Sequence, residues 1–490
     1  MKLYKIILSS LCMAGMTLTT SCDDFLTETP KHQLVEENAV RDYESAKNIV
    51  NGMYSVYEYA TDLGGKATSN LNCQAGLWDY SMNHFNMTYT QSNNTVGGIW
   101  KSLYKCINAA NAAINSIQIA SDNIFPTPEA KAKLIAEARC FRGYMNLQLL
   151  WYFGHWFDEA ESPYGIIYRD QLANLGNLML DRSTVGQSYQ YILDDFEYAE
   201  ENLEDHTTSI YMSKQFAQAM HAKMLTIRGW EGDYQKALEL VNAVLSNPGA
   251  SAIEPDITKL YNDAWDNPEL IFAQNKIDMI ATSSSNYDSA GWSDYIWAAA
   301  LFGARYEDIP TAWLEEDPRH DYIFGMAYGA EKWQVTEGKQ ELTLKKLYHE
   351  GRVVEPNAKY CTYVLRLTEL YILKAELLAR TNPGDLAGAI APINEYRAKY
   401  TNPILPAIPV PTTHESLMDE IFKEYVVSLF LENDAVWFAA IRFQTEGDTW
   451  LKKLKGNEIS YTENQYCWPI PNEEIIAHTN KIEQNPDLEK

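Results

Sequence analysis

The sequence predicts a mostly α-helical protein in which about four helix pairs form a scaffold and a loop-rich, aromatic insertion packs on it. Three observations support this fold class. Apolar residues recur at steps of three and four along most of the chain, which is the spacing of an amphipathic helix. Two pairs of such stretches are joined by short turns, as in helical hairpins. The helical period disappears in two long segments, residues 60–98 and 250–362, which are rich in aromatic side chains instead.

The N-terminal half contains several predicted helices before the first hairpin. In the first of them, Ala46, Val50 and Met53 lie on one apolar stripe. In the second, Trp100 falls on the apolar stripe and is expected in the core rather than at a ligand. Ser183 or Thr184 is placed to cap the last of them. These helices are predicted over residues 36–59, 99–119, 130–153 and 181–203.

Two hairpins and one further helix complete the predicted scaffold. The turn of the first hairpin reads Glu231-Gly232-Asp233-Tyr234, and its second helix follows the pattern Gly-Asp-Tyr-x-x-Ala-Leu. This pattern resembles the second helix of a tetratricopeptide repeat, so the scaffold is expected to be tetratricopeptide-like. The two hairpins and the further helix are predicted over residues 214–230 with 234–245, 366–380 with 385–400, and 415–443.

The N-terminus predicts a secreted and lipid-anchored protein. Residues 1–5 are cationic, residues 6–16 are apolar and uncharged, and small residues precede Cys22. This is the pattern of a secretory signal, and its apolar run is too short to span a bilayer. We therefore expect residues 1–21 to be a lipoprotein signal peptide and Cys22 to be acylated, which anchors the mature chain to a membrane. The alternative is an ordinary secreted protein in which Cys22 only lies near the cleavage site.

Composition argues against several classes of partner. Loss of the signal removes Lys2 and Lys5 from the 40 basic residues and none of the 66 acidic ones, so the mature chain carries 38 basic residues against 66 acidic. This excess of negative charge argues against nucleic acid and favours neutral or cationic ligands. The cysteines after Cys22 show no paired spacing and the histidines no HExxH. Neither a disulfide framework, a metal nor a cofactor is predicted.

Several motifs, in the same order along the chain, resemble the SusD/RagB family of surface lipoproteins. The stretch from Cys22 to Pro30 resembles the family's mature N-terminus, with acidic residues beside the lipidated cysteine. The run Glu137-Ala138-Arg139-Cys140-Phe141-Arg142 resembles a family helix. The runs Tyr466-Cys467-Trp468-Pro469 and Gln484-Asn485-Pro486 resemble the family's C-terminal segment. The matches skip the two aromatic segments.

This resemblance implies one SusD-like domain over residues 22–490. Members of the family capture nutrients, mostly glycans, at the cell surface for a TonB-dependent outer-membrane transporter of the SusC type. We therefore expect a lipid-anchored outer-membrane protein that binds oligosaccharide or polysaccharide, has such a transporter as its partner, and is not an enzyme. Its expected parts are a tether over residues 22–35, an N-terminal helical part over 36–250, a loop-rich insertion over 251–362 and a C-terminal helical part over 363–490.

The two aromatic segments hold the candidate ligand-binding residues. A glycan binder needs flat apolar rings for the C–H faces of sugars and fixed amides or carboxylates for their hydroxyls. No family motif aligns these segments, so the choice rests on composition and position, and core packing is the competing interpretation for each ring. The candidates are Trp78, Tyr80 and Asn83 in the first segment, and Tyr287, Trp292, Tyr295 and Trp297 in the second.

Two other functions were weighed against glycan binding. Helical-repeat scaffolds also form concave surfaces for peptides or proteins, as some relatives of the family do. A helical glycoside hydrolase needs two carboxylates across a cleft, and the insertion offers Glu315, Glu316, Asp317 and Asp321 by residue type alone. The sequence shows no motif of nucleophilic catalysis. Asp317-Pro318-Arg319 is instead predicted to be a turn with an internal ion pair.

Overall fold

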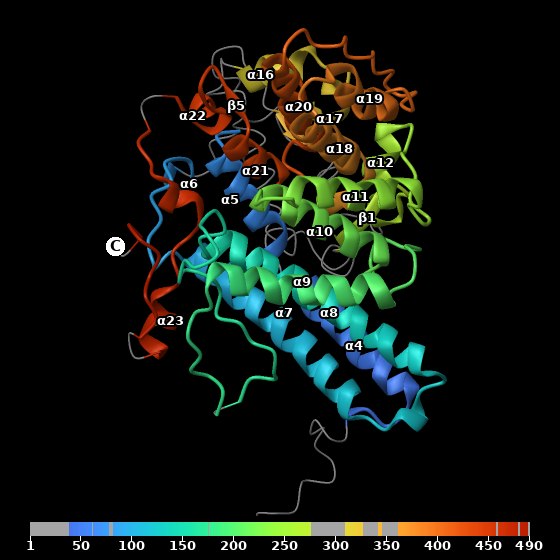
Figure 1. Ribbon diagram of the computed structural model, residues 1–490, viewed down its shortest axis with the longest axis vertical. Coiled ribbons are helices and arrows are strands. Elements are labelled where there is room, and N and C mark those ends of the chain that lie inside the picture. The colour runs from blue at the N-terminus through green and yellow to red at the C-terminus, as the bar shows by residue number, and fades with distance from the viewer. Residues whose placement is uncertain are drawn as a thin grey trace, which may run out of the picture.

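The computed structural model describes most of the chain as a stack of helices (Figure 1). The described residues are 39–60, 62–77, 82–174, 176–275, 309–326, 342–344, 361–456, 459–478 and 481–488. Helices dominate them, which confirms the predicted fold class. No helix among these residues is long and apolar enough to cross a membrane. The predicted signal peptide, Cys22 and the tether over residues 22–35 lie outside the described residues.

In Figure 1, α4, α7, α8 and α9 of the N-terminal part form the lower layers, whereas α5 and α6 lie higher in the view. Within it, α4 packs on α7, α7 on α8 and α8 on α9, while α10 and α11 form the first hairpin. A π-helical turn, Asp62–Lys66, precedes α5. The helices are α4 (Tyr43–Glu58), α5 (Ala67–Gln74), α6 (Met82–Phe85), α7 (Asn94–Ile119), α8 (Pro128–Phe153), α9 (Val185–Asn202), α10 (Lys214–Arg228) and α11 (Asp233–Ser246).

The C-terminal part stacks on the first hairpin through α18, which contacts α11, α19 and α20. Neighbouring pairs therefore form in the order α4 with α7, α8 with α9, α10 with α11 and α18 with α19. Its elements are α18 (Leu367–Thr381), α19 (Leu386–Arg397), α20 (His414–Leu429), α21 (Ala435–Arg442), β5 (Gln444–Thr445), β6 (Asp448–Thr449), α22 (Trp450–Lys455) and α23 (Asn472–Ala477).

The described residues of the insertion form short elements between the two helical parts. β1 and β4 pair antiparallel, with Ala273 opposite Tyr363, and β2 pairs antiparallel with β3. Both strands of the first pair are buried, with β4 buried throughout. The elements are α12 (Ile257–Asp263), β1 (Leu270–Asn275), α16 (Ile309–Glu316), α17 (His320–Ile323), β2 (Phe324–Met326), β3 (Leu342–Leu344) and β4 (Cys361–Arg366).

Local sequence explains where the scaffold helices begin and turn. Thr184 caps α9 in a capping box with Gln187, so Thr184 rather than Ser183 is the cap. In the turn between α10 and α11, Gly229 and Gly232 adopt positive φ angles of 67° and 85°, which glycine reaches without strain. Asp233 holds this turn by accepting two hydrogen bonds from the Arg228 guanidinium, at 2.8 and 2.7 Å.

A close contact joins α8 to α9. Gly143 lets α9 approach, because a Cβ atom at this position would lie 3.1 Å from the Asp195 Cβ. The buried Asp195 carboxylate accepts hydrogen bonds from both Arg139 and Arg142 of α8, each at 2.7 to 2.8 Å. The Arg-x-x-Arg spacing on α8 therefore serves helix packing.

The structure corrects two predictions of secondary structure. Residues 415–443 form two helices, α20 and α21, because the chain between them turns back, with Leu431 at a φ of 54°. Glu432 and Asn433 in this break bond to buried groups, Arg366 and the Val364 carbonyl. Segment 60–98 contains the fully buried α5, whose eight residues face protein on all sides. Such a helix has no solvent-exposed face, so its polar and apolar residues are not segregated and it shows no amphipathic period.

Buried ion pairs connect the insertion to the helical parts. Arg366, at the junction of β4 and α18, donates to Glu432 at 2.7 Å and also pairs with Glu269, which precedes β1. The side chains of all three residues are almost fully buried. The Asp317-Pro318-Arg319 turn contains the predicted ion pair, with Arg319 Nε 2.7 Å from Asp317 Oδ1. The same guanidinium reaches Glu424 of α20 at 2.8 Å.

The Arg366 pair predicts a large stability effect. Replacing Arg366 with Met is expected to lower the free energy of unfolding by about 3–5 kcal/mol, because Glu269 and Glu432 lose their buried cation. Chemical denaturation measures this change. Lys101→Met is the control, because Lys101 pairs with Glu473 in an exposed bridge and its loss is expected to change stability little. Equal effects of the two substitutions would contradict this role of Arg366.

Candidate functional site

Of the predicted ligand-binding residues, the structure describes only Asn83. It lies on α6 with an exposed side chain, and its carbonyl accepts a hydrogen bond from the Thr88 amide at 2.8 Å. The other candidates lie outside the described residues: Trp78, Tyr80, Tyr287, Trp292, Tyr295 and Trp297.

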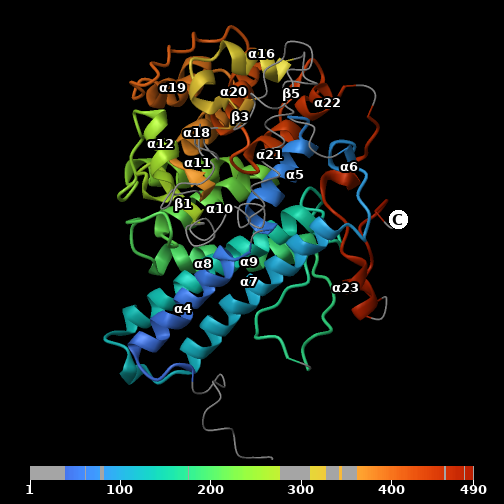
Figure 2. The same cartoon turned by 180° about the vertical axis from the view of Figure 1, so that it is seen from behind.

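One described flank of each aromatic cluster contacts α22. Before the first cluster, the backbone at Gly76 runs against Leu454, so that a Cβ on Gly76 would lie 3.3 Å from the Leu454 Cβ. After the second cluster, Trp313 of α16 packs edge-on against Trp450, with ring centroids 5.2 Å apart. We call the region formed by α5, α6, α16 and α22 the α22 corner, and both views place it on one side of the molecule (Figures 1 and 2).

Burial changes the ionisation of two basic groups at the α22 corner. Lys455 of α22 donates to the Phe85 carbonyl of α6, and burial lowers the pKa of its ammonium to about 7. Burial also lowers the pKa of His84 on α6 to about 4. Each group is held away from water, which stabilises the uncharged form relative to the charged one. The contact between α6 and α22 is therefore desolvated.

The α22 corner lies far from the first described residue of the chain. The described chain begins at Ala39 just before α4, and Tyr43 contacts Phe125, which follows the C-terminal end of α7. α6 precedes the opposite end of α7 in the chain. An α-helix rises by about 1.5 Å per residue, so the 26 residues of α7 separate the two ends by roughly 39 Å.

The four acidic residues that a hydrolase could use lie on and beside α16 and α17. Asp317 is committed to Arg319 within the turn. Glu315, Glu316 and Asp321 are exposed.

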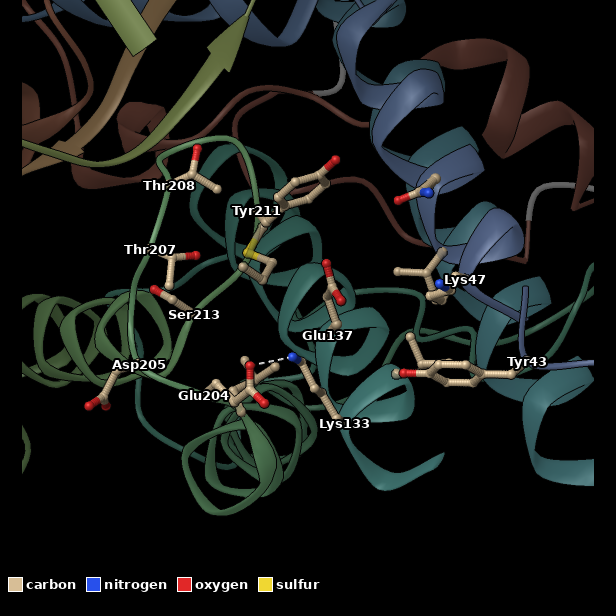
Figure 3. Close-up of a pocket in the computed structure, with 15 residues that line it drawn as sticks. Tyr43, Lys47, Lys133, Glu137, Glu204, Asp205, Thr207, Thr208, Tyr211 and Ser213 are labelled. Carbon is tan, nitrogen blue, oxygen red and sulfur yellow. Dashed lines mark hydrogen bonds and ion pairs between the residues drawn. The ribbon is translucent and has the colours of Figure 1, made fainter. Parts of the chain in front are cut away.

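The structure also contains a polar surface hollow that the sequence did not indicate. It lies between α4, the first half of α8 and the connection from α9 to α10, and we call it the α4–α8 hollow (Figure 3). Its volume is about 240 Å³. Its polar and aromatic lining consists of Tyr43, Lys47, Asn51, Lys133, Glu137, Glu204, Asp205, Thr207, Thr208, Tyr211 and Ser213.

Glu137 occupies the middle of the α4–α8 hollow. It projects from α8 between Tyr211 and Lys133 (Figure 3). The Tyr54 hydroxyl donates to its Oε1 at 2.6 Å, and the Met212 amide donates to the Tyr54 oxygen at 2.9 Å. Burial raises the pKa of the Glu137 carboxyl, against the lowering by the Tyr54 hydrogen bond and by Lys133. Its neighbours therefore offset only part of the free-energy cost of burying the charged Glu137 carboxylate.

A second hollow of about 480 Å³ lies between α7, residues 169–179 and α23. It is the more apolar of the two, with Trp100, Tyr104, Leu178 and Met179 among its lining residues. Trp100 is only 4 % exposed and donates from Nε1 to Glu474 at 3.2 Å. This residue belongs to the core, as predicted.

The sequence analysis did not predict a role for Tyr211, and it assigned Glu137 only to a motif of the helical scaffold. For Tyr211, the local composition of the sequence offered one indication. Tyr211 lies in a short stretch between two helices that combines Thr207, Thr208, Ser209 and Ser213, a polar and aromatic composition like that of the longer aromatic segments. No sequence signal marks Glu137, because its exposure to the hollow depends on how α4 and α8 pack.

The fold and the matches to family models identify the type of protein and its family. The stacked helix pairs, with hollows between them, are those of a helical binding scaffold. A family model described as "Starch-binding associating with outer membrane" matches residues 24–226, and the SusD family model matches residues 186–487. The second match covers more than half of the chain, so the protein belongs to the SusD family. Proteins of this family are binding proteins without catalytic activity, which agrees with the prediction that the chain is not an enzyme.

Relatives share the fold at low sequence identity. A SusD-like protein of Bacteroides ovatus is 21% identical over 92% of this chain and 83% of its own length. A SusD superfamily structure from Bacteroides thetaiotaomicron has a TM-score of 0.66 at 20% identity and covers 91% of this chain and 100% of the other. A laminarin-binding SusD-like protein has a TM-score of 0.69 at 18% identity, with the same coverage. These structural similarities establish the fold.

The buried lysine predicts a pH-dependent stability effect. Because the folded state lowers the pKa of Lys455 to about 7, protonating this amine opposes folding. The penalty is full below about pH 7 and disappears as the pH rises toward the unfolded pKa. Lys455→Met is therefore expected to gain stability relative to the native chain at about pH 6 and to lose that advantage progressively between about pH 7 and about pH 10.5.

Urea denaturation across this pH range measures the effect. The matched control is Lys452→Met on the same helix, because Lys452 lies in an exposed bridge with Asp448. Its stability difference is expected to stay constant with pH. A constant difference for Lys455→Met as well would show that this lysine is solvated in the folded protein.

Proposed function

We propose that the protein is a cell-surface lipoprotein that captures oligosaccharide or polysaccharide and delivers it to a SusC-like TonB-dependent transporter in the outer membrane. Membership of the SusD family is the observation that carries this proposal. The family description that includes starch binding and outer-membrane association supports it, as does the likeness to a laminarin-binding protein. In this proposal Cys22 carries the lipid anchor.

The proposed glycan surface lies at the α22 corner. The described residues before the first cluster and after the second contact α22, and Asn83 adds an exposed amide. Trp78, Tyr80, Tyr287, Trp292, Tyr295 and Trp297 are proposed to supply the stacking rings, together with the amide of Asn83. The roughly 39 Å along α7 then separates the ligand surface from the lipid anchor. A long polymer can reach such a surface without meeting the membrane first.

Lipid anchoring is tested by Cys22→Ala. We expect the variant to appear in the soluble fraction, because it lacks the thiol that is acylated and the chain keeps no other anchor in this proposal. Fractionation of cells and labelling of intact cells measure membrane retention and surface exposure. Cys467→Ala, which changes a buried thiol, is the control. Retention of Cys22→Ala in the outer membrane at the native level would exclude the lipid anchor.

The ligand surface is tested by separate substitutions of Trp78, Trp292 and Tyr295 with Ala. Each stacked ring is expected to contribute about 1.5–3 kcal/mol, so each loss should weaken glycan binding by about tenfold to a hundredfold. Calorimetric titration against a panel of neutral glycans gives the affinities. Tyr191→Ala, on α9 and outside both clusters, is the aromatic control.

Thermal melting of the same variants separates binding from folding. If the substituted tryptophan belongs to the core, its replacement by Ala would instead lower the free energy of unfolding by about 3–5 kcal/mol. A sharp drop in melting temperature, or unchanged affinity in all three variants, would remove these residues from the site. Affinity for a peptide mixture without affinity for any glycan would favour the peptide-binding alternative.

A further inference from the structure

We propose that the α4–α8 hollow is a second ligand site, which takes a single sugar unit bearing a free protonated amine. This site goes beyond the proposed glycan surface, because it shares no residue with the α22 corner. It is built from α4, α8 and the connection from α9 to α10 (Figure 3). Each of its lining residues belongs to the described part of the chain.

Size limits the ligand to about one ring. The hollow holds about 240 Å³, below the roughly 300–1,000 Å³ of pockets that bury drug-sized molecules. Its lining combines charged and hydroxyl groups with aromatic rings, as a sugar requires. An extended oligosaccharide therefore has room for one unit inside, with its neighbours in solvent.

The central carboxylate defines the polar half of the site. Glu137 uses Oε1 to accept from Tyr54, and no donor among the described residues bonds to its Oε2. Lys133 lowers the pKa of Glu137, but its ammonium is already paired with Glu204 across the hollow. A partly desolvated carboxylate with a vacant oxygen gains most from a charged donor, since such hydrogen bonds are about twice as strong as neutral ones.

Tyr211 supplies the apolar half. Its side chain is 41 % exposed, and its ring packs edge-on against Tyr54, with centroids 5.2 Å apart. Tyr54 therefore holds both the ring of Tyr211 and the carboxylate of Glu137 in fixed positions. An exposed ring beside a carboxylate suits the C–H face of a sugar and attracts a nearby cation.

Charge selects the amine over neutral or anionic sugars. The lining carries three carboxylates (Glu137, Glu204 and Asp205) against two ammonium groups, of Lys47 and Lys133. The whole chain is strongly acidic as well, with a net charge of −26. A protonated amine placed at Glu137 would neutralise the excess carboxylate, whereas a sugar carboxylate would add to it.

Titration of the full mature chain with glucosamine, glucose and N-acetylglucosamine tests the site. Glucosamine is expected to bind in a saturable manner at one site, and the two neutral sugars at least about tenfold more weakly. Glu137→Gln should remove this preference, because the amide oxygen still accepts from Tyr54 but carries no charge. Tyr211→Ala should weaken all three sugars. Glu239→Gln, an exposed acid on α11, should change nothing.

Several results would overturn this inference. They are equal affinities for the three sugars, no saturation by glucosamine, or a preference that survives in Glu137→Gln. Melting curves of the variants establish that they are folded, and Tyr211→Ala provides an independent test because its side chain is partly exposed. The proposed glycan surface is tested separately by Trp292→Ala. If Trp292→Ala loses glycan capture but still binds glucosamine, the second site stands apart from the glycan surface. If Trp292→Ala keeps glycan capture but loses glucosamine binding, glucosamine does not bind in the α4–α8 hollow, and the second site is excluded.

Discussion

The charge of Arg366 constrains how the three parts of the chain meet. Its guanidinium lies in the interior, where an unpaired charge would cost several kcal/mol. It is neutralised by Glu269 from the segment before β1 and by Glu432 from the break between α20 and α21, and it also donates to the Ser428 carbonyl. Each partner comes from a different element. The helix break follows from this requirement, because a continuous helix would not bring Glu432 and its neighbour Asn433 to these contacts.

Buried ion pairs also connect α18 to α21. Glu376 accepts from Arg442 and Arg380, and these guanidinium groups lower the pKa of its carboxyl to about 2 against the effect of burial. Lys223 of α10 lies 2.8 Å from both Glu369 and Asp434. Buried pairs of this kind add little net stability compared with apolar packing, but separating the partners is costly. A shifted helix register could still pack its apolar residues, but it would separate these charges, so the buried pairs favour the native register.

The stacked helices determine where the α22 corner and the α4–α8 hollow lie in the molecule. The length of α7 fixes the distance between the described start of the chain and the α22 corner. The α22 corner borders the two aromatic segments, and segments that connect scaffold elements commonly carry function. The α4–α8 hollow differs in kind, since it is formed by the scaffold helices themselves and by the short connection that carries Tyr211.

Sequence by itself determined the helical class, the two hairpins and the family, because an amphipathic period and a glycine turn are local properties of the chain. It also predicted the Asp317–Arg319 ion pair, whose partners are two residues apart. Tertiary structure alone decided the burial of α5, whose surroundings are protein on every side, and the break before α21, which depends on a cation far away in the sequence. It also decided the environment of Glu137, because the position of a carboxylate between two packed helices and a distant loop leaves no periodic trace in the chain.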